Sequence, residues 1–210
     1  SSPETSQRGN FFGILGMVLA IMVTFLFVEI LFSSLLFIIC ALAIGGSIGA
    51  IIAYRISMTA MPQLVAGFHS LVGLAAVLVA LSAFYNPEAF ELGTLNNIKT
   101  ASLVEMSIGA SIGAITFTGS IIAFLKLQGL MSGVPIIFKG QHFINLLIGI
   151  GIIFLIVYLT INQSSHIFLI LIAISFLIGV QLIIPIGGAD MPVVISMLNS
   201  YSGWAALGIG

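Results

Sequence analysis

The sequence predicts an all-α, polytopic transmembrane helix bundle, and three features support this prediction. The chain has 210 residues, of which 60% are hydrophobic and only 5% are charged. A soluble domain carries about 25% charged residues, so this chain has too few charges to cover a surface that faces water. Its apolar residues also form long runs without the alternation that marks strands. Because lipid offers no partners to open backbone groups, such runs cross a bilayer as helices.

Seven apolar stretches approach the roughly 20 residues that a helix needs to cross the hydrocarbon core. We expect spans at residues 11–27, 35–54, 62–84, 103–125, 143–160, 167–184 and 191–210. Residues 1–10 are polar and form a leader on the inner side, so residues 11–210 make up one transmembrane domain. The chain lacks an initiator Met and stops inside an apolar stretch. We therefore expect the natural polypeptide to continue and this domain to be partial.

Basic residues indicate which side of the membrane each connection faces. Arg8, Arg55, Lys126 and Lys139 fall on one side of the predicted bundle, whereas Lys99 alone falls on the other. Lys and Arg accumulate on the cytoplasmic side of membrane proteins. The N-terminus and the four basic residues are therefore predicted to lie inside.

One histidine, His69, lies within the third predicted span, among almost wholly apolar residues. An ionisable side chain at membrane depth is costly, and it occurs mainly on pathways for ions or protons. The unperturbed pKa of histidine is also the closest of any side chain to physiological pH. The alternative is a structural histidine that joins two helices by a hydrogen bond. At membrane depth the sequence favours the functional interpretation.

Small residues indicate which helices pack closely, because helix association in lipid relies on close backbone approach. They recur at spacings of three and four on four spans: Ala43, Gly46, Ala50 and Ala53; Ala66, His69, Gly73, Ala76, Ala80 and Ala83; Gly109, Gly113, Thr116, Ser120 and Ala123; Ser196, Asn199, Gly203, Ala206 and Gly210. We expect the third, fourth and seventh spans to form an inner cluster with the second close by. The fifth and sixth spans, rich in Ile, Leu and Phe, are predicted to form an outer layer that faces lipid.

The third and seventh spans also resemble each other. Residues 61–76 align without a gap with residues 191–206, so that Met, Pro, Ser, Gly and two Ala coincide. His69 then falls opposite Asn199, and each lies roughly 10 Å along its helix from the Met-Pro start. Equal depth predicts a contact between them, direct or through water. The similarity arises either from a true repeat or by chance. The argument from equal depth does not depend on common ancestry. On its own, Asn199 has the alternative role of a hydrogen bond between helices.

Other polar residues near these helices have both a structural and a functional interpretation. Asp190 precedes Met-Pro, so it is either a helix N-cap or a gating residue at the inner mouth. Glu105 is either interfacial or part of an outer entrance. Thr116 and Ser120 either line a water path or bond back to helix carbonyls. The predicted proton path comprises His69, Asn199, Ser70, Ser196, Ser200, Thr116, Ser120 and Glu105, and the predicted gating residues are Asp190 and Arg55.

Several function classes find no support in the sequence. The net charge of −1 offers no basic patch for nucleic acid. The pair Gly149 and Gly151 lies inside a span and lacks the third glycine and the strand–turn–helix context of a dinucleotide site. Metal ligands do not cluster, and no nucleophile stands beside a base. We expect this stretch to bind no cofactor or metal and to contain no catalytic residue.

Long motifs in the chain resemble the membrane domain of proton-translocating NAD(P)+ transhydrogenase, in its beta-subunit part. They comprise residues 58–79, residues 109–120, the run 187–192 and the Trp-Ala-Ala at 204–206. The polar segment 4–13 is similar to the stretch that follows the first span of that subunit. The resemblance covers essentially the whole chain. By this resemblance, we expect the first and last beta-type spans of the family, its alpha-type membrane helices and its NADP(H)-binding domain to lie outside this stretch, which alone should neither bind nucleotide nor transfer hydride.

The resemblance implies an enzyme that couples hydride transfer between NADH and NADP+ to inward proton movement. The family's membrane histidine and asparagine correspond to His69 and Asn199, and its loop aspartate corresponds to Asp190. It further implies NAD(H) and NADP(H) as cofactors of the complete enzyme and the alpha-type helices and soluble nucleotide-binding domains as partners. A homodimer of complete units in a bacterial or mitochondrial inner membrane is also implied.

Two alternatives stand beside this interpretation. A secondary transporter or ion channel also places polar groups near the midplane between small-residue helices. A non-catalytic assembly subunit is the third possibility. A further span and a dinucleotide-binding domain encoded beyond residue 210 would favour transhydrogenase over both.

Overall fold

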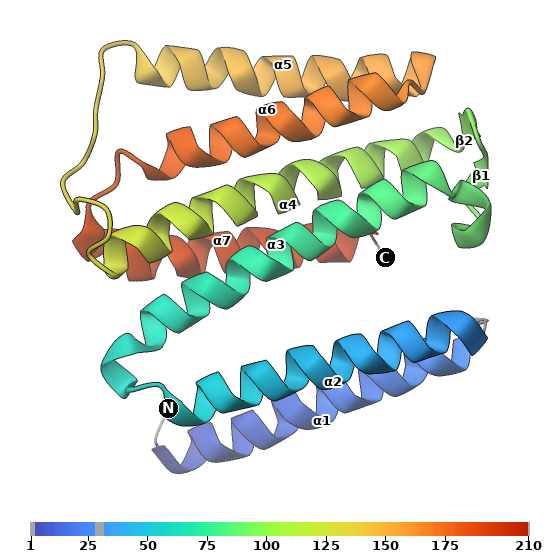
Figure 1. Cartoon of the computed structure of the whole chain (residues 1–210). Coiled ribbons are helices and arrows are strands. Elements are labelled where there is room, and N and C mark those ends of the chain that lie inside the picture. Colours follow the sequence, from blue (N-terminus) through green and yellow to red (C-terminus); the bar gives the residue numbers. More distant parts are fainter. Residues whose placement is uncertain (1–2, 28–31, 210) are drawn as a thin grey trace. The chain divides into compact units, whose positions relative to one another are not determined.

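A computed structural model describes residues 3–27 and 32–209. Its helices are α1 (Pro3–Phe27), α2 (Phe32–Arg55), α3 (Met61–Tyr85), α4 (Thr100–Leu127), α5 (Gln141–Asn162), α6 (Ser165–Ile183) and α7 (Met191–Ile209) (Figure 1). Short 3₁₀ helices occupy Met58–Ala60, Pro87–Phe90 and Gly188–Asp190. The two-residue strands β1 (Gly93–Thr94) and β2 (Asn97–Ile98) pair as a hairpin between α3 and α4. The all-α prediction is confirmed.

Six of the helices, α1 to α6, are long and apolar enough to cross a membrane, as judged from the described residues. The predicted seventh span does form a helix, α7, but it is not among these six. The chain is therefore a polytopic helix bundle.

The chain divides into two units, residues 1–56 and residues 57–210. In the first unit, α1 and α2 are almost continuously apolar, and their described side chains are exposed or half-buried. The second unit holds the other five helices. Across it α4 lies between α3 and α6, α5 lies beyond α6, and α7 packs mainly against α4 (Figure 1).

Glycines allow α3 and α4 to approach closely. A Cβ added to Gly73 would lie 2.7 Å from both the Gly113 carbonyl oxygen and the Phe117 backbone nitrogen. A Cβ on Gly113 would lie 2.8 Å from the Gly73 carbonyl oxygen. The small-residue stripes predicted on these two spans are therefore their contact faces, as expected for helices that associate by close packing.

Two apolar cores fill the second unit. The hairpin core, on the side of the β-hairpin, includes Val77, Phe84, Leu103, Ala114 and Phe168. The α7 core includes Ala66, Ile122, Ala123, Ile183, Met191, Val194, Ile195 and Leu198. Thr116 and Ser120 lie on α4 between Ala114 of the first core and Ile122 of the second. The buried hydroxyl groups thus occupy the layer between the two cores.

The predicted outer layer of spans five and six is only half correct. Helix α5 is mostly exposed, but α6 packs directly on α4. Gly179 makes this possible, because a Cβ there would lie 2.7 Å from the Ile115 carbonyl oxygen and would also collide with Thr118 Oγ1. The hydroxyl of Thr118 donates to the Phe176 carbonyl at 2.9 Å. The apolar composition of α6 did not indicate this close contact with α4, because the contact depends on a single glycine.

The predicted contact face of α7 is wrong. Ser196, Asn199 and Gly203 are exposed, whereas the bulky Val194 and Leu198 are buried against α4. The space for these side chains comes from the partner helix: Gly119 of α4 lies beside Leu198, whose Cδ1 would be 3.5 Å from an added Cβ. Small residues are needed on only one of two packed helices.

The starts of α3 and α7 agree with the similarity between the two segments. Each helix begins at a Met followed by Pro, directly after a three-residue 3₁₀ helix. Proline suits the first helical turn, where its missing N–H has no helix partner. The aligned sequences therefore form the same local structure.

Candidate functional site

The imidazole of His69 is buried where α3 meets α7. Only 6% of the residue is exposed. Its Nε2 lies 3.4 Å from the hydroxyl oxygen of Ser202, at the long end of the hydrogen-bond range. Ser202 comes from the second half of α7, and its hydroxyl is half-buried. The site histidine therefore reaches the seventh helix, as the sequence predicts, but through a different residue.

The Ser202 hydroxyl has two further partners, both on its own helix. Its Oγ lies 3.0 Å from the Leu198 carbonyl oxygen and 3.1 Å from the Asn199 carbonyl oxygen. A hydroxyl has one hydrogen to donate and two lone pairs to accept with. It can donate to a carbonyl while accepting from a protonated His69 Nε2, or turn and donate to a bare Nε2. The contact suits either protonation state of that nitrogen.

The expected contact between His69 and the Asn199 side chain is not formed. Asn199 is exposed, and within the described residues its side chain makes no hydrogen bond, while its backbone carbonyl accepts from Ser202. The reason is the rotation of α7 described above, which turns the small-residue face outward. A position three residues along the helix supplies the partner instead. Sequence inspection offered no signal for Ser202 beyond its being a hydroxyl one helical turn from Asn199.

Buried hydroxyls without partners form the next part of the site. Thr116 and Ser120 are completely buried, and neither hydroxyl has a hydrogen-bond partner among the residues that the structure describes. Thr116 packs on α3, since its Cβ would lie 3.1 Å from a Cβ on Gly73, one turn along α3 from His69. Buried polar groups normally find partners. Unpartnered hydroxyls near a buried imidazole are groups that water or a proton can engage.

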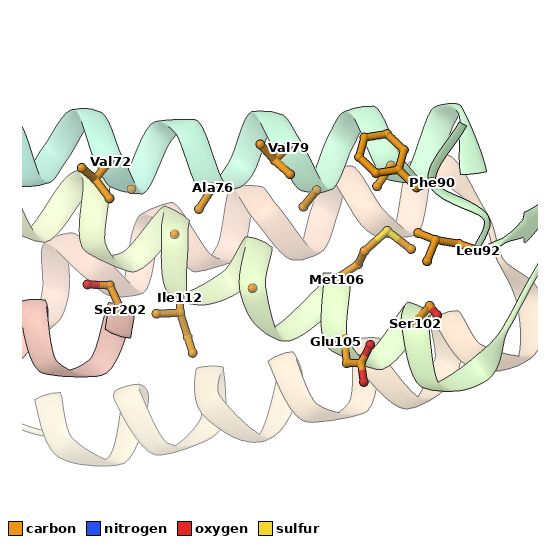
Figure 2. A pocket seen from close by; sticks show the side chains of 15 residues that line it. Val72, Ala76, Val79, Phe90, Leu92, Ser102, Glu105, Met106, Ile112 and Ser202 are labelled. Atoms are coloured by element: carbon orange, nitrogen blue, oxygen red, sulfur yellow. The ribbon is translucent and has the colours of Figure 1, made fainter. Parts of the chain in front are cut away.

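A cavity of about 440 Å³ runs along α3 and α4 toward the hairpin. Most of its wall is apolar, but Glu105, Ser102 and Ser202 contribute polar atoms. Figure 2 shows Ser202 at one end of the cavity and Ser102 and Glu105 toward the other. The volume equals that of roughly a dozen waters. The cavity leads from an exposed carboxylate to the hydroxyl that contacts His69.

The other predicted path residues lie outside this arrangement. Ser70 is buried, but its hydroxyl donates within α3 to the Gly67 carbonyl at 2.7 Å. Ser196 and Ser200 are exposed on the outward face of α7. The structure places Ser202 in contact with His69 and buries Thr116 on α4 beside Gly73 of α3.

The predicted gating residues are both exposed. Asp190 ends the 3₁₀ helix that precedes α7, and Arg55 ends α2 in the other unit. Lys126, expected in an inner loop, instead lies in the last turn of α4 with its side chain buried. Within the described residues, no group of three or more His, Cys, Asp or Glu side chains is arranged to hold a metal ion.

Comparison with known proteins agrees with this architecture. The family model for the NAD(P) transhydrogenase beta subunit matches residues 1–210. Two curated relatives are each named NAD(P) transhydrogenase subunit beta, one from Rhodospirillum rubrum and one from a named strain of that species. Each is 54% identical over 210 residues, which is 100% of this chain and 45% of the relative. The chain thus spans less than half the length of these relatives.

Six apolar helices that can span a bilayer and this family match together identify an integral membrane protein. The chain belongs to the NAD(P) transhydrogenase beta-subunit family.

Proposed function

We propose that the chain is part of the proton-translocating membrane domain of an NAD(P) transhydrogenase, formed by residues 11–210 behind an inner-side leader at residues 1–10. The complete enzyme couples hydride transfer between NADH and NADP+ to inward proton movement. One observation carries this proposal. A cavity between apolar helices ends at the Ser202 hydroxyl, which contacts the buried imidazole of His69.

The outer half of the path follows the cavity. Water held between Glu105, Ser102 and Ser202 delivers a proton to the end of α7. Such water needs two to four polar partners, and these residues are the polar groups of an otherwise apolar wall. The Ser202 hydroxyl passes the proton to His69 Nε2 and then turns to the Leu198 or Asn199 carbonyl. A hydroxyl that can donate in both directions makes this step possible without moving a helix.

The inner half of the path uses the buried hydroxyls. Thr116 and Ser120 stabilise water beside the protonated imidazole, since a charge at membrane depth needs nearby dipoles. Asn199 acts from the adjoining face of α7 in the complete protein. Asp190 and Arg55 at the inner ends of their helices gate exchange with the inner side.

The outward face of α7 is an argument for partner helices in the complete enzyme. Ser196, Asn199 and Gly203 form a small, polar face that is exposed in this unit. Such a face is unfavourable against lipid and favourable against another helix. We propose that alpha-type membrane helices of the same enzyme pack against this face of α7. The soluble domains of the complete enzyme bind NAD(H) and NADP(H), and this chain binds neither. We further propose that the complete units form homodimers and lie in a bacterial or mitochondrial inner membrane.

A secondary transporter or channel is the alternative. A cavity of about 440 Å³ beside a midplane histidine also suits a small solute or ion. Such a protein moves its solute without nucleotides. Proton movement that requires both nucleotides therefore separates the two functions.

The test blocks the cavity in the complete enzyme, reconstituted in sealed liposomes. Val79 and Leu78 are neighbours on α3 and are exposed to similar extents, 51% and 56%, but only Val79 lines the cavity. Val79→Trp is expected to slow proton movement by about tenfold, equivalent to about 1.4 kcal/mol in the barrier. Leu78→Trp places the same indole ring outside the cavity and is expected to leave the rate unchanged. Internal pH and hydride transfer are recorded together.

Two results would refute the proposal. Wild-type enzyme that transfers hydride in sealed liposomes without any change of internal pH would exclude proton translocation. Equal rates for Val79→Trp and Leu78→Trp would exclude the cavity as the path.

A further inference from the structure

The side chain of Lys126 binds the chain segment that leads into α7. The residue is 5% exposed in the last turn of α4. Its Nζ donates to the Ile184 carbonyl at 2.6 Å and to the Ile186 carbonyl at 2.7 Å. Hydrogen bonds this short are typical of a charged donor. No carboxylate pairs with Lys126 among the described residues, so the two backbone oxygens are its partners.

The chemistry of a helix end explains why a lysine stands here. Helix α6 ends at Ile183, and the last carbonyls of a helix have no partner within it. The same end carries the negative pole of the helix dipole, which favours a cation. Lys126 satisfies two carbonyls at or just beyond this end. The bonds join the end of α4 to the segment that follows α6, which lies 58 and 60 residues further along the chain.

The bound segment runs directly to Asp190. From Ile186 it continues through Gly187 into the 3₁₀ helix Gly188–Asp190 and then into α7. Its other anchors are backbone only: the Gly188 N–H donates to the Gly133 carbonyl at 2.9 Å, and the Ile136 N–H donates to the Ile184 carbonyl at 3.4 Å. The contact is tight, because a Cβ on Gly188 would lie 3.2 Å from the Gly133 Cα. Lys126 is thus the side-chain anchor of a short segment that ends in an exposed carboxylate.

The same helix carries the buried hydroxyls. Ser120 and Thr116 precede Lys126 by six and ten residues on α4, or roughly 9 and 15 Å along the helix axis. A rigid helix therefore joins the layer around His69 to the segment that carries Asp190. Any displacement of that segment must either move the end of α4 or break the Lys126 bonds.

We infer that Lys126 is a positioning residue, which fixes the segment 184–190 to the end of α4 and so holds Asp190 in place at the start of α7. Its consequence for proton movement rests on the proposed function. Without the anchor, Asp190 is no longer held in register with the α4 hydroxyls, and proton movement becomes uncoupled from hydride transfer. The positional part of the inference stands on the two hydrogen bonds alone.

The positional part is tested by thiol labelling in the complete enzyme. A single cysteine replaces exposed Ala189 in a background with Cys40→Ser and no other reactive thiol, and a water-soluble maleimide is added. Lys126→Met is expected to raise the labelling rate by about tenfold through local opening of the segment. Lys126→Arg keeps the donors and is expected to stay near wild type. The control is Lys139→Met, because Lys139 is an exposed basic residue in the α4–α5 connection.

The functional part is tested by the number of protons moved per hydride transferred in liposomes. A merely structural lysine would lower both activities together and leave this ratio unchanged. Lys126→Met is expected to lower the ratio, and Lys126→Arg is expected to restore it. Lys126→Gln, which keeps one donor group for one carbonyl, provides a milder variant if the Met variant does not fold.

The outcomes separate the claims. An unchanged labelling rate in Lys126→Met and Lys126→Gln would overturn the positional inference. Faster labelling with an unchanged proton-to-hydride ratio would overturn its link to coupling. If wild-type enzyme moves no protons, the proposed function fails, while the labelling rates still decide whether Lys126 holds the segment.

Discussion

Two buried basic side chains differ in how firmly they are held. His69 makes a long contact, 3.4 Å, to a hydroxyl that has other partners, and it also bonds to the backbone of Leu198 on the same helix. Lys126 has two contacts at 2.6 and 2.7 Å to carbonyls that a helix end leaves open. On α4 the buried hydroxyls of Thr116 and Ser120 have no partner within the described part of the chain, whereas the segment that Lys126 binds has backbone anchors as well.

The difference shows what each region can do. A side chain that must gain and lose a proton cannot depend on a fixed set of partners, because the partners of the two protonation states differ. The open hydroxyls around His69 allow its partners to change with its protonation state. A residue that fixes the position of a loop needs a constant set of partners, and Lys126 has such a set. The predictions below test this contrast, from the largest expected effect to the smallest.

Removing the firm anchor should cost the most stability. Lys126→Met leaves two carbonyls without their charged donor, and we expect the free energy of unfolding in detergent to fall by about 3 kcal/mol. Lys139→Met, at an exposed position, should change it by less than about 0.5 kcal/mol. Equal unfolding free energies for the two variants would mean that the Lys126 bonds do not stabilise the fold.

Removing the loose partner should affect proton movement more than folding. Ser202→Ala deletes the hydroxyl that contacts His69 Nε2, and we expect proton movement in liposomes to slow by about fivefold, the value of one ordinary hydrogen bond. Ser200→Ala, at an exposed position on the same helix, should leave the rate unchanged. If the two serine variants behaved alike, Ser202 would have no special role.

Two threonines on α4 provide the finest comparison. The Thr118 hydroxyl donates to the carbonyls of Ala114 and Phe176, whereas the Thr116 hydroxyl has no partner in residues 3–27 and 32–209, which the structure describes. Thr118→Val should lower the free energy of unfolding by about 0.6 kcal/mol, the average worth of a hydrogen bond between membrane helices. Thr116→Val should not lower it, yet should slow proton movement. The opposite order of stabilities would contradict the contrast between satisfied and open hydroxyls.

Much of the fold followed from composition and spacing. Long apolar runs gave the helices, and the small-residue stripes around Gly73 and Gly113 identified the closest helix pair correctly. The burial of His69 on that stripe also agreed with prediction. These features depend on one helix at a time, so a sequence pattern is enough to reveal them.

The errors concern how one helix is rotated against another. For α7 the small face was expected to point inward, but Gly119 on α4 accepts Leu198 and turns the bulky face in. Ser202 rather than Asn199 therefore meets His69. The role of Lys126 was missed for a related reason, because its acceptors are backbone oxygens far along the chain and carry no side-chain signature.

The most direct test of the account replaces the imidazole itself. Complete enzyme with His69→Ala is compared in sealed liposomes with His142→Ala, since His142 is an exposed histidine of the same chain. We expect His69→Ala to reduce proton movement by about a hundredfold or more, the usual contribution of a group that transfers protons, and His142→Ala to match wild type. Proton movement at the wild-type rate in the folded His69→Ala enzyme would remove His69 from the path.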